Sequence, residues 1–232
     1  GGYPVTGIYN AVFKGCKDIT GVFFPKSLVS IGDKAFSECT GIEFLYFNDG
    51  LVSIGDEAFS ECTELIRIII PDSTVSIGMK AFFGCSDVGT IELGKGLTSI
   101  GSGAFAGCKN AGYSVSIPKN VTTIENSLFY DCGLMETVII PESVTVIEDW
   151  AFYNCGVTKV RYTGTEAQWK KITIGIKNEN LEKARVEYNV HIHDYEEVEV
   201  PATCTKDGYI VKTCACGDSY TSLGEIKKGH AY

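Results

Sequence analysis

Long apolar runs are absent from this sequence of 232 residues, and no stretch approaches the ~18 residues that a membrane-spanning helix needs. Basic residues are also few: 20 Lys and Arg stand against 29 Asp and Glu, and the resulting formal charge of −9 opposes binding to nucleic acid. Histidine occurs three times, always at or beyond position 191, and there is no Gly-rich phosphate loop, nucleophile elbow or His-Glu-x-x-His motif. These absences predict a protein without a membrane span, a nucleic-acid partner or catalytic activity.

An internal repeat is the main positive feature, and residues 51–73, LVSIGDEAFSECTELIRIIIPDS, show its most regular copy. Seven cysteines mark the copies at spacings of 23 residues, and once of 24: Cys16, Cys39, Cys62, Cys85, Cys108, Cys132 and Cys155. A phenylalanine stands three residues before each cysteine. One such unit cannot bury its apolar side alone, so the period predicts a solenoid of stacked coils. The extra residue before Val115 predicts a weak strand and a local bulge there.

Each unit contains an L-x-x-I-x-I-P segment, whose alternation predicts a strand. In the third unit Ile68 and Ile70 face inward and Pro71 ends the strand. The equivalent inward pairs are Val22 and Phe24, Leu45 and Phe47, Ile91 and Leu93, Val115 and Ile117, Val138 and Ile140, and Val160 and Tyr162. Stacked strands form a parallel sheet. The D-x-A-F-x-x-C run that follows the L-x-x-I-G step leaves room only for a short helical turn.

The repeat IGDEAFSECTELIRIIIPDS resembles the BspA-like subgroup of leucine-rich repeats, which occurs in bacterial and some protist surface proteins, and the match covers about residues 5–162. The resemblance implies a leucine-rich-repeat solenoid, a β-rich right-handed superhelix. It also implies secretion, attachment to the bacterial cell surface and adhesion to proteins of a host or a neighbouring cell. The general leucine-rich consensus places Asn or Cys after the strand, where this chain has Ser27, Gly50, Ser73, Gly96, Asn120 and Ser143, so no asparagine ladder is expected. No secretory signal precedes the repeats, and we interpret Gly1 as a mature or truncated start.

The seven repeat cysteines, called the ladder cysteines below, can be explained without disulfides. At a repeated buried position a cysteine behaves as a small hydrophobe. Neighbouring coils lie ~5 Å apart, within the Cα range for a bridge, but parallel side-chain vectors disfavour the torsion of about 90° that a disulfide needs. We therefore expect the ladder cysteines to be reduced.

The period indicates three segments. Residues 1–162 form seven coils, and residues 163–190 form a C-terminal cap in which Thr165 caps a short helix and Trp169 covers the last coil. Residues 191–232 form a separate small module, because their composition changes and the period is lost.

This last module has few apolar residues and so needs a staple. The candidate residues for a metal or disulfide site are His193, Cys204, Cys214, Cys216 and His230. A Cys3His set can hold a structural zinc ion, yet zinc ribbons use two C-x-x-C knuckles and this chain has one C-x-C. A bridge from Cys204 to Cys214 or Cys216 is an equal alternative, and free thiols are the third.

Outward strand residues are the candidate binding site, since solvent-facing sheet positions are normally polar and the first coils break this rule. They are Phe23, Phe44, Tyr46, Arg67, Ile69 and Glu92. Strand propensity alone, or cover by preceding repeats, also explains such a cluster. We expect a secreted or cell-surface protein that binds protein ligands, with a carbohydrate-binding or wall-anchoring module as the alternative. Asp33 and Asp56 recur at one repeat position, which favours solvated turn residues over an acid/base pair.

Overall fold

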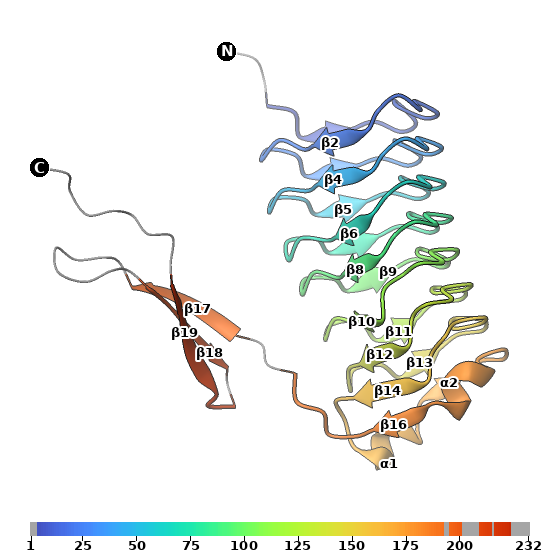
Figure 1. Cartoon of the computed structure of the whole chain (residues 1–232), viewed down its shortest axis with the longest axis vertical. Coiled ribbons are helices and arrows are strands. Elements are labelled where there is room, and N and C mark those ends of the chain that lie inside the picture. The colour runs from blue at the N-terminus through green and yellow to red at the C-terminus, as the bar shows by residue number, and fades with distance from the viewer. Residues whose placement is uncertain (1–3, 193–194, 201–208, 215, 224–232) are drawn as a thin grey trace, which may run out of the picture. The chain divides into compact units, whose positions relative to one another are not determined.

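The computed structural model describes residues 4–192, 195–200, 209–214 and 216–223. It divides the chain into two compact units, with the division between Val190 and His191. The first unit is a solenoid of stacked coils (Figure 1). The second is a small antiparallel sheet, and each unit is described by itself.

Two short strands from each coil build two parallel ladders, so the extended L-x-x-I-G step pairs as well as the predicted strand. The first ladder contains β1 (Gly7–Ile8), β3 (Ser30–Ile31), β5 (Ser53–Ile54), β7 (Ser76–Ile77) and β9 (Ser99–Ile100), then β11 (Thr123–Ile124), β13 (Val146–Ile147) and β15 (Thr173–Ile174). The second contains β2 (Gly21–Phe23), β4 (Phe44–Tyr46), β6 (Arg67–Ile69), β8 (Thr90–Glu92), β10 (Ser114–Ser116), β12 (Thr137–Ile140), β14 (Lys159–Tyr162) and β16 (Arg185–Glu187). Equivalent residues pair, as Ile31 does with Ile54.

Both ladders are interrupted near the inserted residue, the first between β9 and β11 and the second between β8 and β10. The second ladder has a further interruption between β4 and β6, where no residue is inserted. Tyr113, just before β10, is largely exposed. The predicted weak strand at this point is a three-residue strand, β10, which pairs with β12 and not with β8.

The inward residues that the alternation predicted are buried or half-buried, and the core is a stack of rings. Phe59 is fully buried, and its ring centroid lies 5.3 Å from that of Phe36 and 5.2 Å from that of Phe82. The stack continues through Phe105 and Phe129 at centroid distances of 5.6 and 5.7 Å. One aromatic ring per coil therefore forms a continuous column, as the period requires.

Six of the seven ladder cysteines are buried; Cys16 in the first coil is exposed. None of the seven forms a disulfide. The Sγ of Cys62 donates to the carbonyl oxygen of Phe36 at 3.3 Å, and Cys85 makes the same contact with Phe59. The thiol is therefore a small apolar group that also supplies a weak hydrogen bond to the preceding coil.

The expectation of a short helical turn in the D-x-A-F-x-x-C run is wrong. Lys34 and Glu38 have left-handed φ angles of 56° and 63°, and equivalent residues do the same in other coils. The N–H groups of Lys34, Phe36 and Glu38 donate to carbonyl oxygens of the next coil at 2.7–2.8 Å. A helical turn needs such N–H groups for carbonyls within its own segment. The run is instead a pair of tight turns that bonds to its neighbour.

Residues 163–190 form an eighth, divergent coil, because β15 and β16 extend both ladders. Its helices are α1 (Glu166–Trp169) and α2 (Glu179–Lys183). Thr165 caps α1 with a capping box, as predicted, and the Trp169 ring lies edge-on to Tyr162. The side chain of the buried Asn178 replaces a backbone acceptor in this coil: its Oδ1 accepts the Phe152 N–H at 3.0 Å, where the Phe129 N–H donates to the Ala151 carbonyl.

The second unit contains β17 (Tyr195–Val200), β18 (Tyr209–Cys214) and β19 (Ser219–Leu223). They form an antiparallel sheet in that order.

Candidate functional site

The six outward residues singled out from the sequence lie on β2, β4, β6 and β8, the second strands of the first four coils. We call Phe23, Phe44, Tyr46, Arg67, Ile69 and Glu92 the aromatic patch. Phe23 is 77% exposed, and Tyr46 and Ile69 are each 40% exposed. Their inward neighbours Leu45 and Ile68 are buried, so strand alternation fixes which side chains face solvent.

Strand pairing joins the patch residues of β2 with those of β4 and the patch residues of β6 with those of β8, and side-chain contacts connect the two pairs. Phe23 pairs with Tyr46, and their rings stack with centroids 4.4 Å apart and planes inclined by 3°. Phe44 lies beside Tyr46 at a centroid distance of 6.5 Å. The guanidinium carbon of Arg67 lies 5.7 Å from the centroid of the Tyr46 ring, a cation–π contact. Tyr46 is thus held between its neighbours, while Phe23 has one strand partner.

Farther along the same ladder the outward side chains are charged, a grouping that the sequence analysis did not single out. Glu187 lies 3.0 Å from the Nζ of Lys159, 3.9 Å from Arg161 and 3.7 Å from Arg185. The hydrogen bond from Lys159, with the charges around it, lowers the pKa of Glu187 below its ordinary value. Three cations around one carboxylate leave this end of the ladder basic, in contrast with the aromatic patch.

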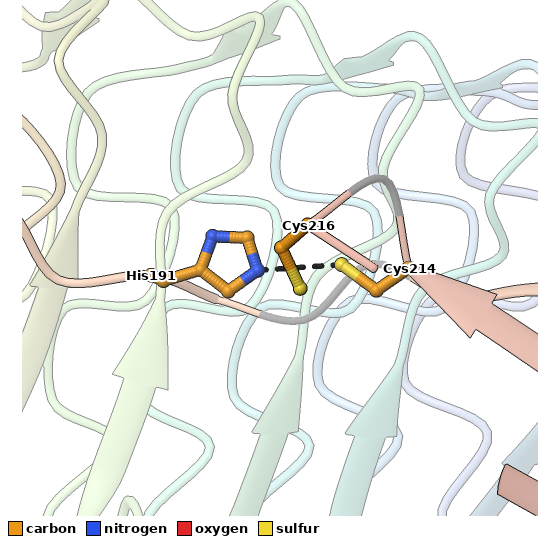
Figure 2. Close-up of side chains that lie close together, drawn as sticks. All are labelled: His191, Cys214 and Cys216. Carbon is orange, nitrogen blue, oxygen red and sulfur yellow. Dashed lines mark hydrogen bonds between the residues drawn. The ribbon is translucent and has the colours of Figure 1, made fainter. Parts of the chain in front are cut away.

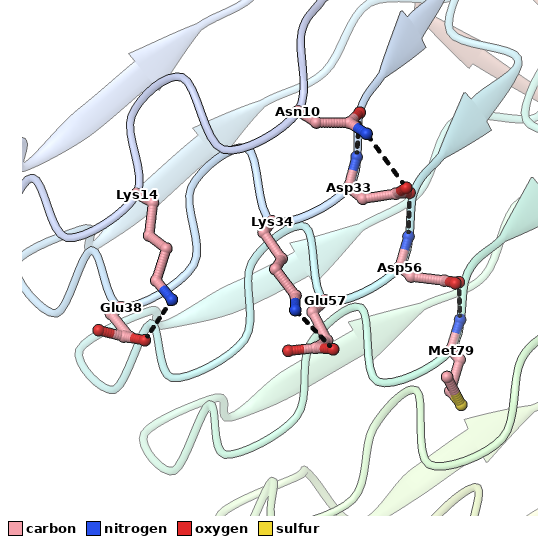
Figure 3. Close-up of polar contacts among 8 residues, drawn as sticks. All are labelled: Asn10, Lys14, Asp33, Lys34, Glu38, Asp56, Glu57 and Met79. Carbon is pink, nitrogen blue, oxygen red and sulfur yellow. Dashed lines mark hydrogen bonds and ion pairs between the residues drawn. The ribbon is translucent and has the colours of Figure 1, made fainter.

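The repeated aspartates have a structural role that the sequence did not reveal (Figure 3). The Oδ1 of Asp33 accepts the backbone N–H of Asp56 at 2.9 Å, and Asp56 accepts that of Met79 at 2.7 Å. Asn10 begins the row and Asp149 repeats the contact with Ile176. Each carboxylate thus bonds to the next coil, an arrangement that explains the repeat without acid/base chemistry.

A second cluster lies in the C-terminal unit (Figure 2). His191, Cys214 and Cys216 place one ligand atom each within 4.8 Å of one another. The Nε2 of His191 lies 3.3 Å from the Sγ of Cys214.

Two of the five residues that the sequence nominated, Cys214 and Cys216, are thus together. The other three, His193, Cys204 and His230, lie outside the described residues. The sequence analysis missed His191, although it stands two residues before His193 in the same H-x-H string.

No helix in the described part of the chain is long and apolar enough to cross a bilayer. The BspA type leucine rich repeat region model matches the chain in six copies, over residues 6–132, 54–173 and 112–191. No curated protein matches it.

Solved structures resemble the chain as well. A leucine-rich repeat protein of T. pallidum is 29% identical, with a TM-score of 0.62 over 67% of this chain and 72% of its own. A leucine-rich repeat protein of Bacteroides ovatus is 26% identical, with a TM-score of 0.58 over 80% of this chain and 59% of its own. With its ladders, its ring column and this match over most of its length, the chain belongs to the BspA-type leucine-rich repeat family.

Proposed function

We propose that this chain is a non-catalytic adhesion protein of the bacterial cell surface that binds protein partners through the aromatic patch. The observation that carries the proposal is the exposed stack of Phe23 on Tyr46. Outward positions on the next strands are polar, such as Thr90, Ser114 and Ser116. An apolar cluster on an otherwise polar sheet face is typical of an interaction site.

A partner that buries the aromatic patch gains binding free energy from the apolar area removed from water. An aromatic side chain buries roughly 150–250 Å² when enclosed. Phe23 is 77% exposed, so a partner that encloses it removes roughly 100 Å² from water, worth about 2.5 kcal/mol at ~25 cal/mol per Å². Two or three such side chains are enough for a hot spot. Cover by a preceding coil does not account for Tyr46 and Ile69, because each already has a coil before it and is still 40% exposed.

The ring geometry favours a protein partner over a carbohydrate. Sugar binding by stacking requires an open ring face. One face of Tyr46 contacts Phe23, and the Arg67 guanidinium lies over its ring. The patch therefore offers mainly ring edges, the Ile69 side chain and one charge, which suit apolar protein side chains beside a carboxylate.

A double variant, Phe23→Ser with Tyr46→Ser, tests the proposal. Its binding is compared with that of the parent on immobilised host extracellular proteins and on a glycan array. The matched control is Tyr113→Ser, since Tyr113 is an aromatic residue that is 74% exposed outside the patch. We expect the double variant to lose at least about tenfold in affinity for a protein that the parent binds, and the control to keep it. Equal binding by the double variant, or binding to glycans alone, would contradict the proposal. Protease treatment of intact cells tests the surface location separately.

A further inference from the structure

The described residues of the C-terminal unit supply few buried apolar side chains. Among its described side chains Cys214 alone is buried. Val198 is 60% exposed, and Tyr209 and Tyr220 are also exposed. Small units of this size generally depend on a disulfide or a metal. The one buried side chain among the described residues, Cys214, is a cysteine, a residue type that commonly binds metal ions.

Two features of the sheet position the three candidate ligand residues: the pairing of β17 with β18 and the turn that follows β18. Tyr195 pairs with Cys214 across β17 and β18, so the segment that leads into β17 brings His191 to the end of β18. A tight turn then connects β18 with β19: the Cys214 N–H donates to the Asp218 carbonyl at 2.8 Å, and the Gly217 N–H to that of Cys214 at 2.9 Å. Gly217 has a φ of 93°, which a residue with a side chain rarely adopts. Both cysteines thus sit on one constrained turn.

Ligand spacing fits a tetrahedral ion. With zinc–sulfur distances of about 2.3 Å and zinc–nitrogen distances of about 2.0–2.1 Å, a tetrahedral site separates nitrogen from sulfur by about 3.6 Å and two sulfurs by about 3.8 Å. The observed separation of Nε2 and Sγ is 3.3 Å, and all three ligand atoms lie within 4.8 Å of one another. Only small side-chain rotations separate this arrangement from a binding site.

We propose that His191, Cys214 and Cys216 bind one zinc-class divalent ion that staples the C-terminal unit. The imidazole nitrogen and two thiolates are the ligands; binding releases one proton from each thiol, and the ion undergoes no redox change. The proposal replaces the sequence-derived His193 with His191. It is independent of the aromatic patch, since it concerns the other unit. Cys204 lies outside the described residues and enters only as a separate variant in the test.

Cobalt(II) is the probe, because it occupies zinc sites and its visible spectrum reports tetrahedral thiolate ligands. The full chain is purified under reducing conditions, stripped with a chelator and titrated with cobalt, and zinc is then added as competitor. We expect one equivalent of cobalt to bind with a tetrahedral spectrum that zinc abolishes. Loss of an outer-shell partner already lowers metal affinity by roughly 10- to 100-fold, so His191→Ala, Cys214→Ser and Cys216→Ser should each weaken binding by at least about 100-fold.

Two controls separate the site from its surroundings. His193→Ala removes the neighbouring imidazole, and Cys16→Ser removes an exposed cysteine of the other unit; both should bind cobalt as the parent does. Cys204→Ser reports whether a fourth thiolate contributes. Protease should cleave the parent within residues 191–232 only after chelation, and this readout stays valid where a variant fails to fold. The proposal is overturned by the absence of a tetrahedral spectrum, by full binding in His191→Ala, or by thiol counts showing that Cys214 and Cys216 are oxidised in the purified chain.

Discussion

Replacing Phe59 by Ala tests the central feature of the solenoid, the column of rings. Phe59 is fully buried. Its ring stacks between those of Phe36 and Phe82 and contacts Phe24 and Phe47 edge-on. Burying a phenylalanine contributes about 1.5–3 kcal/mol, and each stacked ring pair adds about 0.5–1.5 kcal/mol. With two stacked pairs the sum is about 2.5–6 kcal/mol, which brackets the range of about 3–5 kcal/mol found for Phe→Ala in cores.

The cavity cannot close easily, because each flanking ring is held by its own coil. The N–H groups of Phe36 and Phe82 donate to Ala58 and Ala104 at 2.8 Å, and these bonds fix the coil spacing. Phe13 provides the matched control: it stacks on Phe36 alone and is 38% exposed. Phe13→Ala should therefore lower the free energy of unfolding by only about 1–2 kcal/mol.

Urea unfolding measured by circular dichroism and by tryptophan fluorescence gives the comparison. Trp150 and Trp169 report on the C-terminal coils, whereas circular dichroism reports on the whole array. We expect the Phe59→Ala midpoint to fall clearly below that of Phe13→Ala in both signals, since coils are coupled to their neighbours. If Phe59→Ala unfolds at the parent midpoint, the inward face has been assigned wrongly.

Two further predictions concern the ladder cysteines. Thiol counting in denaturant without reductant should find at least seven thiols, and among the ladder cysteines only the exposed Cys16 should react rapidly in the native protein; three or fewer thiols would show that adjacent coils are bridged. Burial raises the pKa of Cys108 from 9.0 to about 12, so its folded form keeps the proton that the unfolded form loses above pH 9. This contribution to stability is complete below pH 9 and is lost between pH 9 and 12, at up to ~1.4 kcal/mol per pH unit. Cys108→Ala should show a smaller fall in urea midpoint than Cys16→Ser over that range, and parallel curves would refute the assignment.

The sequence was most informative where one residue type recurs for one physical reason. Alternation identified Ile68 as inward and Ile69 as outward because a strand has only two faces, and burial agrees at both positions. The cysteine spacing located the added residue before β10, where β10 no longer pairs with β8. Such inferences need only the period and the geometry of a strand.

Backbone conformation was harder to predict from one copy of the repeat. Lys34 and Glu38 take left-handed φ angles although neither residue type favours them, and equivalent positions of the fifth coil hold Gly103 and Gly107. The two glycines in the fifth copy therefore indicated two tight turns, and not a helix, at these positions of the repeat. The N–H bonds to the next coil compensate the strain in the copies that lack glycine.

The eighth coil and the cluster of His191, Cys214 and Cys216 were hidden for different reasons. Residues 163–190 lack the Phe and Cys anchors, and α1 lengthens the coil, so the period disappears while the strand pairing continues. In the C-terminal unit the ligand choice depends on the pairing of β17 with β18, which spacing along the chain does not reveal. His191 is brought to Cys214 by a hairpin register and not by proximity in sequence.

Strand pairing and ring stacking respond differently to the inserted residue, and this difference explains how the array stays continuous. The second ladder breaks between β8 and β10 and the first between β9 and β11, yet Phe82 still stacks on Phe105 at 5.6 Å, and the Phe82 N–H still donates to Ala104 at 2.8 Å. The Sγ of Cys132 likewise donates to the Phe105 carbonyl at 3.2 Å. The insertion is therefore absorbed between the ladder cysteine and the following strand, while the column of rings and thiols couples the two halves. The aromatic patch lies on the β2–β4 and β6–β8 pairs, and the Arg67 guanidinium over the Tyr46 ring joins the two pairs where no strand pairing does.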